Sequence, residues 1–308
     1  MSLDNLKTDR MDFDFLDQSL RFFGVEQSIT GSAQPQITGA SLKSVILPVP
    51  PLPEQERIAE ILTSVDDSIR ATEAVIAQAE RVKRGLMEDL LTGGLGSEAI
   101  MRGEVPDRWA VMQVGELAEV KGGKRMPKGA PFSEKPTPYP YVRVTDFKGG
   151  TISKEDLKFV SEEHHAQIAR YTISKDDIYI SIAGTLGVVG LVPENLDGAQ
   201  LTENAAKIVL KGDCEISKEY LALVLQSEVG QSQIHVRKGV GGGVPKLALF
   251  RIAEINVPVP PTQEQKQTSR AVGSIDKSLL ENSKAVEQLQ RLKRGLMDDL
   301  LTGRVRTV

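Results

Sequence analysis

The segment KRGLMEDLLTG at residues 83–93 occurs a second time, as KRGLMDDLLTG, at residues 293–303. The two copies differ at one position and are 210 residues apart. The same offset places the PVPP motif of residues 48–51 on residues 258–261. A period of this length is far above the roughly 20–50 residues of stacked repeat arrays. The sequence therefore contains one structural module that is used twice.

Apolar residues in each copy recur at steps of three and four, or at their sums, as they do along one face of a helix. They are Ile58, Leu62, Val65, Ile69, Ile76, Val82, Leu86 and Leu90, and then Val272, Ile275, Leu279, Val286, Leu289, Leu292, Leu296 and Leu300. Each run follows a proline cluster, has Glu54 or Glu264 in its first turn, and ends at a glycine. The pattern predicts two helices of about 39 residues, each roughly 58 Å long at 1.5 Å per residue.

A helix of this length with a narrow apolar stripe favours packing against a similar helix. We therefore expect an antiparallel coiled-coil pair. A parallel pair and two independent surface helices on separate domains are the alternatives. Gly85 and Gly295 each cost about 1 kcal/mol against alanine inside a helix, so we expect another backbone to approach them closely. The residues expected at the contact between the helices, or with a partner subunit, are Leu86, Leu90, Leu296 and Leu300.

Composition limits the class of protein. A chain of 308 residues, of which 40% are hydrophobic, is long enough for one or two cored domains. Cys214 is the only cysteine, which excludes an internal disulfide and fits a reducing cytoplasm. With three histidines, the chain has too few ligands for a structural zinc site by themselves. No stretch approaches 18 consecutive apolar residues and the N-terminus is polar, so no membrane segment is expected.

The charge is unevenly distributed. A net charge of −4 argues weakly against a nucleic-acid-binding protein. Residues 1–104 carry 10 Lys/Arg and 17 Asp/Glu, but residues 105–260 carry 19 of each. Within that middle region, residues 120–133 and 229–253 contain bases and no acids. Local basic patches of this kind are what phosphate binding requires.

Four segments are expected along the chain. Residues 1–53 have the order of elements expected at the end of a domain whose body is absent. Residues 54–94 form the first long helix, residues 95–260 a complete domain, and residues 261–308 the second long helix and a tail. Short strands with glycine turns and a few helices predict an α+β fold for the complete domain. Short helices are expected at 14–23 and 220–226, and strands at 42–47, 139–144, 177–182, 188–192, 206–210 and 252–257.

The sequence contains no complete catalytic motif. No glycine-rich loop ends in Gly-Lys-Ser/Thr, as a P-loop would, and residues 239–243 lack the third glycine of a dinucleotide fingerprint. Residues 137–140 lack the polar residue that opens the loop of an amino-methyltransferase. Asp107 together with residues 156–158 is a faint match to a metal-dependent nuclease, which is the remaining enzymatic alternative. No Ser/His/Asp or Cys/His set is spaced for nucleophilic catalysis.

Several motifs resemble those of the specificity (S) subunit of type I restriction–modification systems. Pro-Pro-x-x-Glu-Gln before a long helix that ends in KRGLM-x-DLLTG is similar to its conserved region. The segments similar to its target recognition domains are Val105-Pro106 with Trp109, Arg143-Val144-x-Asp146 and Gly184-Thr185-x-Gly187. The resemblance covers nearly the whole chain. It implies a non-catalytic subunit whose complete recognition domain reads half of a bipartite site on double-stranded DNA.

The resemblance also implies partners. In this family, methylase subunits that hold S-adenosylmethionine dock on the paired helices and methylate adenine. Motor-nuclease subunits, which use ATP and magnesium, join for cleavage, so this chain itself is expected to bind no cofactor. The family order is domain, helix, domain, helix. The short first segment departs from it and implies either a truncated first domain or a second S chain that supplies the other half-site reader. An assembly or clamp protein that binds methylase or another S chain without reading DNA is the alternative function.

Candidate DNA contacts lie in the acid-free runs or near the ends of expected strands. Phosphate contacts position a recognition domain, and contacts to base edges specify sequence. Arginine often reads guanine with two hydrogen bonds, whereas lysine more often binds phosphate. Each candidate has the alternative of being a solvated surface residue, and Arg143 that of an internal ion pair with Asp146. The candidates are Lys124, Arg125, Lys128, Arg143, Lys148, Thr185, Asn204, Arg237, Lys238 and Lys246.

Overall fold

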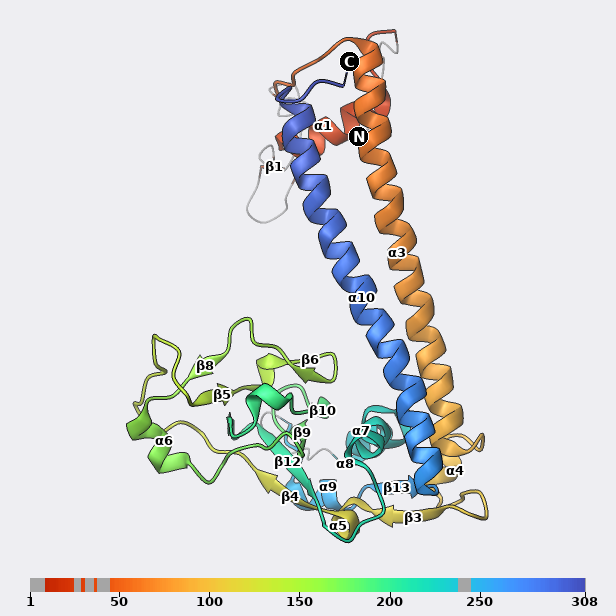
Figure 1. Cartoon of the computed structure of the whole chain (residues 1–308), viewed down its shortest axis with the longest axis vertical. Coiled ribbons are helices and arrows are strands. Elements are labelled where there is room, and N and C mark those ends of the chain that lie inside the picture. Colours follow the sequence, from red (N-terminus) through yellow and green to blue (C-terminus); the bar gives the residue numbers. More distant parts are fainter. Residues whose placement is uncertain (1–8, 25–28, 31–35, 38–44, 238–244, 308) are drawn as a thin grey trace. The chain divides into compact units, whose positions relative to one another are not determined.

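The computed structural model describes residues 9–24, 29–30, 36–37, 45–237 and 245–307 (Figure 1). The chain forms two compact units. Unit 1 comprises residues 1–81 and 276–308, and unit 2 comprises residues 82–275. Unit 1 contains α1 (Phe13–Phe23), β1 (Ile29–Thr30) and β2 (Gln36–Ile37), while α3 (Leu52–Thr92) and α10 (Thr262–Leu301) contribute residues to both units.

Both long helices expected from the duplicated motif are present. Helix α3 has 41 residues and α10 has 40. Each is followed by a glycine in the left-handed region, Gly93 at φ 60° and Gly303 at φ 75°. Residues with a Cβ rarely adopt this conformation, so the glycine explains why both helices end within one residue of the same point of the motif. None of the helices in the described part of the chain is long and apolar enough to cross a membrane.

The long helices run antiparallel within each unit. In unit 1, Leu62 near the start of α3 shares a buried cluster with Leu301 at the end of α10. In unit 2, Leu91 near the end of α3 shares a core with Val272 near the start of α10. These contacts confirm the expected antiparallel pairing and exclude the parallel and independent arrangements.

The most deeply buried positions of the repeated motif are shifted by one residue from those expected. Three of the four expected residues, Leu86, Leu90 and Leu296, are half-buried, and only Leu300 is buried. The residues that follow Leu86, Leu90, Leu296 and Leu300 are all buried, namely Met87, Leu91, Met297 and Leu301. These buried residues share clusters both with the other long helix and with short elements of their own unit, so the buried face of each helix end includes one more position than the expected stripe.

The expected backbone approach to the two motif glycines is wrong within the described chain. A Cβ built on Gly85 or Gly295 would meet no atom within 4 Å. One turn before them, Val82 and Leu292 are 50% and 52% exposed, although both belong to the expected apolar stripe. The same open helix surface is therefore present once in each unit.

Unit 2 contains the expected α+β domain. Its helical segments are α4 (Ser97–Met101), α5 (Val114–Leu117), η2 (Val144–Asp146), α6 (Glu162–Ile168), η3 (Glu194–Leu196), α7 (Lys218–Gln226), α8 (Glu228–Arg237) and α9 (Leu249–Ala253). Its strands are β3 (Ala110–Gln113), β4 (Ala118–Gly122), β5 (Pro140–Val142), β6 (Phe147–Lys148), β7 (Thr151–Ile152), β8 (Lys158–Phe159), β9 (Ile178–Ser181), β10 (Val189–Leu191), β11 (Gln200–Leu201), β12 (Ala205–Leu210) and β13 (Asn256–Val259).

The strands of unit 2 form several small sheets around a shared core. The largest is the antiparallel sheet β10-β9-β12-β4, beside a three-stranded sheet β11-β5-β8 and the pairs β13-β3 and β6-β7. All four residues of β9 are buried, because both faces of this strand are covered. On one face Ile178 and Ile180 pack in the cluster that contains Leu221 of α7. On the other, the ring of Tyr179 stacks on Phe147 with centroids 4.0 Å apart.

Three expected strands differ from the structure. The strand expected at 139–144 ends at Val142, because Val144–Asp146 forms η2. The strand expected at 252–257 begins only at Asn256, because Leu249–Ala253 forms α9. Ile252 in α9 and Ile255 just before β13 are both buried, and their spacing of three residues is typical of a helical turn and not of an alternating strand. Of the strand expected at 42–47, residues 42–44 lie outside the described residues, and residues 45–47 are not in a strand.

Candidate nucleic-acid interface

Three loops that are far apart in the sequence meet at the ends of β4, β9 and β11. The amide of Lys124 donates to the Leu201 carbonyl at 2.8 Å, which joins the loop after β4 to the end of β11. The amide of Ile182, just after β9, donates to the Asn204 carbonyl at 2.8 Å. A β-bridge between Ala183 and Lys246 adds the segment before α9. This loop cluster brings together five predicted DNA contacts, Lys124, Arg125, Thr185, Asn204 and Lys246.

Gly123 allows the first loop to enter the cluster. A Cβ at this residue would lie 2.1 Å from the Thr202 carbonyl oxygen and 2.4 Å from that of Leu201. No side chain fits at these distances, so only glycine lets the strand end pass so close to the neighbouring backbone. The side chains of Lys124 and Arg125 follow directly and are exposed.

The predicted cations of the loop cluster differ in their charge environment. Arg125 Nε lies 2.5 Å from Glu203 Oε1, in an ion pair whose guanidinium is 77% exposed. Burial alone would raise the pKa of Glu203, but the hydrogen bond from Arg125 and further hydrogen bonds hold it below its ordinary value. Lys124, Lys128 and Lys246 are exposed and, among the described residues, pair with no carboxylate. These three lysines are therefore the predicted contacts most open to a phosphate.

Arg143 and Lys148 are held by carboxylates of their own segment. Arg143 Nη2 lies 2.8 Å from Asp146 Oδ1 and 3.1 Å from Asp156 Oδ2, and the Asp146 side chain is 4% exposed. Arg143 thus forms the internal ion pair that was the alternative to a DNA contact. Lys148 Nζ lies 2.9 Å from Glu155 Oε2, with both side chains largely exposed. An exposed pair of this kind is weak, so Lys148 can exchange its partner.

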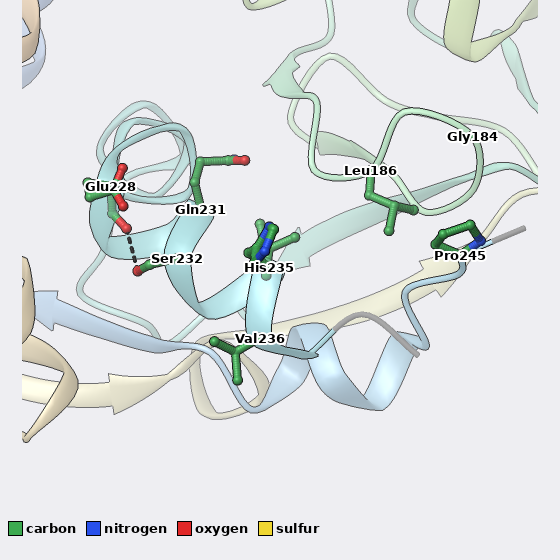
Figure 2. A pocket seen from close by; sticks show the side chains of 9 residues that line it. Gly184, Leu186, Glu228, Gln231, Ser232, His235, Val236 and Pro245 are labelled. Atoms are coloured by element: carbon green, nitrogen blue, oxygen red, sulfur yellow. Dashed lines mark hydrogen bonds between the residues drawn. The ribbon is translucent and has the colours of Figure 1, made fainter. Parts of the chain in front are cut away.

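The second acid-free run is only partly described. Arg237, the last residue of α8, donates to the carbonyls of Gln233 and Glu254 at 3.3 and 3.2 Å. Lys238 lies outside the described residues. A hollow of about 640 Å³ lies between α8 and the Gly184–Gly187 loop, with Leu186 and Pro245 facing Gln231 and His235 (Figure 2). Its described lining contains the carboxylate of Glu228 but no lysine or arginine, so it does not suit a phosphate.

A second hollow contains cations that the sequence analysis did not select. It has a volume of about 450 Å³, and Lys121, Arg170, Tyr171 and Lys207 line it. Lys121 belongs to the first acid-free run, but Arg170 and Lys207 are isolated bases in the sequence. The pairing of β4 with β12 places Lys207 opposite Lys121, and the bridge between Thr172 and Gln200 brings in the segment of Arg170. A single sequence carries no signal for either pairing.

The two long helices start with the same hydrogen-bonded cap. In unit 2, the Gln265 amide oxygen accepts from Ser217 N at 3.0 Å, and its nitrogen donates to the carbonyls of Glu215 and Pro260. In unit 1, the Gln55 oxygen accepts from Asp12 N at 2.9 Å, and its nitrogen donates to Arg10 and Pro50. Each glutamine side chain therefore ties the start of a long helix to the segment before a short helix, α7 or α1.

The glutamate before each glutamine binds a different segment in the two units. Glu264 accepts from Trp109 Nε1 at 3.1 Å and forms an ion pair with Arg108, at the opening of the recognition domain. Glu54 accepts two hydrogen bonds from Arg306, at 2.5 and 2.6 Å. The hydrogen bond from Arg306 holds the pKa of Glu54 below its ordinary value. The C-terminal tail thus takes in unit 1 the position that the domain opening takes in unit 2.

No group of three or more His, Cys, Asp or Glu in the described parts of the chain is arranged to hold a metal ion. The pair that resembled a nuclease site is accounted for by other contacts, because Asp156 pairs with Arg143 and Lys158.

The duplicated helices, the recognition domain between them and the loop cluster define a class of protein. Residues 2–81 and 106–291 match the model of the type I restriction modification DNA specificity domain, and the chain belongs to this family. The resemblance stated from the motifs is confirmed.

Curated relatives are specificity subunits of type I restriction enzymes. The MjaVIII subunit of Methanocaldococcus jannaschii is 25% identical over 284 residues, which cover 90% of this chain and 66% of the relative. The EcoBI subunit of Escherichia coli is 25% identical over 258 residues, covering 77% and 52%. The chain therefore spans less than two thirds of the length of these relatives.

Solved structures show the same fold. The S subunit from M. genitalium superimposes with a TM-score of 0.62 at 19% identity, covering 96% of this chain and 74% of that one. A structure titled for the assembly and conformational transition of a type I R-M system gives 0.56 at 16% identity, covering 93% and 67%. These similarities confirm the expected α+β architecture with two long helices.

Proposed function

We propose that this chain is the non-catalytic subunit that reads DNA sequence for a type I restriction–modification complex. The observation that carries the proposal is the loop cluster, where Lys124 and Lys246 lie on neighbouring loops without a described carboxylate partner. Exposed lysines so placed bind DNA phosphates and displace counterions. Thr185 and Asn204 lie among them and have side chains that can hydrogen-bond base edges. Family membership supports the same role.

In this complex the chemistry belongs to partner subunits. Methylase subunits hold S-adenosylmethionine and methylate adenine, and motor-nuclease subunits use ATP and magnesium to cleave DNA. The chain itself binds none of these cofactors. It determines where its partners act, through one half-site read by the domain at 95–260.

Selection of bound sites from random DNA tests this role. The purified complex of the chain with its methylase and S-adenosylmethionine is mixed with a random duplex library, and the bound fraction is sequenced. One short enriched motif is the expected result, present once where the complex holds one S chain and twice where it holds two. Lys124→Ala with Lys246→Ala should weaken retention of all bound sequences. A library with no enriched motif would refute sequence reading. Two separated motifs from a complex with one S chain would refute a single half-site.

The open helix surfaces at Val82 with Gly85 and at Leu292 with Gly295 are the proposed methylase docking positions. At each position an apolar side chain is about half exposed, and a Cβ added to the glycine three residues later would meet no atom within 4 Å. A partner helix can therefore approach closely, which explains a glycine that weakens the helix. Val82→Asp or Leu292→Asp should each reduce the number of bound methylase subunits, measured by mass. Val75→Asp, at a 53% exposed position outside the motif, is the matched control.

A second S chain is the proposed source of the other half-site reader. In unit 2, β13 (Asn256–Val259) pairs with β3 (Ala110–Gln113), directly after Arg108 and Trp109. Its sequence equivalent in unit 1, residues 46–49, pairs with no strand among the described residues, and Ile46 is 88% exposed. This segment lies next to Glu54 and has open backbone groups, so it matches an incoming segment that carries an arginine or tryptophan followed by a strand.

A peptide with the sequence of residues 105–113 tests this surface. It should bind the full chain, and bind more tightly to Arg306→Ala, in which the tail no longer occupies Glu54. Ile46→Asp should abolish binding, whereas Val75→Asp should not. Two differently tagged S chains should also co-purify through the same surface. Peptide binding that is unaffected by Ile46→Asp, or tagged chains that never co-purify, would contradict the proposal.

One observation favours the alternative of an assembly protein that no longer reads DNA. Arg125, Arg143 and Lys148 each have a carboxylate partner, which lowers the positive charge available to DNA. A gel shift with methylase, S-adenosylmethionine and random DNA separates the two functions. A methylase complex that forms normally but does not shift DNA would establish the alternative.

A further inference from the structure

The basic hollow beside the loop cluster holds more positive charge than its own carboxylates balance. Lys121 of β4 and Lys207 of β12 are directly opposite in the antiparallel pair, so both side chains project from the same face. Like charges directly opposite each other destabilise a sheet. Each lysine has one carboxylate, Glu119 for Lys121 and, at 3.2 Å, Asp177 for Lys207.

Two further cations have no carboxylate in the described chain. Arg170 Nη2 donates to the Tyr171 hydroxyl at 2.9 Å, and its guanidinium carbon lies 5.0 Å from the centre of the Tyr171 ring. Lys124 Nζ lies 5.6 Å from the centre of the same ring. Tyr171 therefore holds Arg170 at the hollow and Lys124 beside it. Of the three cations that line the hollow, the two lysines each have one carboxylate and Arg170 has none among the described residues. An anion bound there would remove the repulsion.

We propose that this hollow binds a backbone phosphate of the DNA duplex whose bases the loop cluster reads. The inference rests on the proposed DNA-reading function and adds a positioning site to it. Arg170 offers the planar fork that matches two phosphate oxygens, and Lys121 and Lys207 add point charges. The Tyr171 hydroxyl accepts from Arg170 and keeps its own proton to donate to the phosphate.

Hydrogen bonds connect the hollow to the loop cluster, which identifies duplex DNA as the source of the phosphate. The amide of Leu201 donates to the Tyr171 carbonyl at 3.0 Å, and the amide of Lys124 donates to the Leu201 carbonyl at 2.8 Å. The proposed phosphate site and a predicted DNA contact are therefore neighbours on one backbone network. A duplex read by the loops runs past the hollow with its backbone.

The salt dependence of DNA binding tests the proposal. Binding of the full chain, in complex with methylase, to a labelled random duplex and to a target duplex is measured by fluorescence anisotropy at several salt concentrations. Loss of one phosphate contact in Arg170→Ala should reduce the slope of log K against log salt by about 0.9. Affinity for both duplexes should fall by the same factor. Arg170→Lys should keep most of the slope. Arg102→Ala, which removes an exposed guanidinium paired with Glu104, is the control.

Three results would overturn the phosphate site. They are an unchanged slope in Arg170→Ala, a loss confined to the target duplex, and equal competition by submillimolar inorganic phosphate at constant ionic strength, which would define a small-anion site. Arg170 is exposed, and thermal unfolding checks that the variant is folded. A separate result would refute the proposed DNA-reading function. A wild-type complex with no preference for any sequence would refute reading, while the slope comparison on random duplex would still hold.

Discussion

Unit 1 and unit 2 contain the same helix cap, but they complete it with different segments. Gln55 and Gln265 are each 1% exposed and make equivalent hydrogen bonds to the segments before α1 and α7. Beyond the cap, unit 2 adds the domain opening at Glu264 and the strand pair β13-β3. Unit 1 has Arg306 at Glu54 and no described strand beside residues 46–49. The duplication therefore preserves the attachment of the helices, and among the described residues the two units differ in the segment that completes the cap.

The largest expected loss in the free energy of unfolding comes from replacing the large buried side chain next to each helix cap with alanine. Phe15 and Tyr220 are buried at equivalent positions, three residues after the capping side chains of Asp12 and Ser217. Phe15→Ala and Tyr220→Ala should each cost about 3–5 kcal/mol in their own unit. Trp109, the only tryptophan, lies in unit 2 and reports its unfolding by fluorescence. In urea, Phe15→Ala should shift the circular-dichroism transition but not the fluorescence transition, and Tyr220→Ala should shift both. Equal fluorescence shifts would show that the units unfold together.

Replacing the cap glutamines should have a smaller effect. Gln55→Ala or Gln265→Ala leaves buried backbone groups without a partner and should cost about 2 kcal/mol. Gln→Glu at the same positions keeps the accepting oxygen and removes the donor, so its cost separates the two roles. The two alanine variants should show equal losses, each in its own transition. A loss at Gln265 alone would mean that the cap of unit 1 contributes nothing.

The smallest expected effect depends on pH and is confined to unit 1. Lys293 Nζ lies 2.7 Å from Asp66 Oδ1, with both side chains about one-fifth exposed. Burial alone would raise the pKa of Asp66, but hydrogen bonds from Lys293 and Gln18 hold it below its ordinary value. A lowered carboxyl pKa stabilises the fold above the unfolded pKa, and this contribution is lost as pH falls through the folded pKa. Asp66→Asn should therefore cost about 1 kcal/mol at pH 7 and nothing near pH 2.

Glu54 provides a control for the same measurement. Its pKa is also lowered, so Arg306→Ala should destabilise unit 1 at neutral pH and match the wild type in strong acid. Arg108→Ala removes a 72% exposed guanidinium from Glu264 and leaves the hydrogen bond from Trp109 in place. Its effect on unit 2 should be smaller than that of Arg306→Ala on unit 1. A larger effect of Arg108→Ala would show that the contact between Arg306 and Glu54 adds little to the stability of unit 1.

The local sequence pattern was sufficient to predict the two long helices and most strands of the largest sheet. The repeated motif carries both the apolar stripe and the terminal glycine, so the bounds of α3 and α10 follow from it. β9, β10 and β12 are runs of β-branched and apolar residues, and their ends differ by one residue from those expected. α9 was missed because it has only five residues, too few for a helical period to show in the sequence.

The site could be predicted only in part, because charge along the sequence does not show which charges meet. Arg125 lies in a run without acids, yet the fold brings Glu203 to it from 78 residues away. Lys207 is one base in an apolar strand, and only the register of β12 against β4 places it opposite Lys121. Cation selection from sequence therefore finds candidates, and long-range pairing decides which of them are available to DNA.

Gly123 marks the boundary between a strand end whose backbone position is fixed and a loop whose side chains can be changed. The residue lets the chain cross the neighbouring backbone and supplies no chemistry of its own, and the loop at 124–128 begins immediately after it. Substitutions in that loop leave the strand pairing of β4 and β12 intact. On the proposed DNA-reading function, randomising residues 124–128 while Gly123 is kept should yield new target preferences, because the turn fixes the start of the loop and leaves its side chains variable.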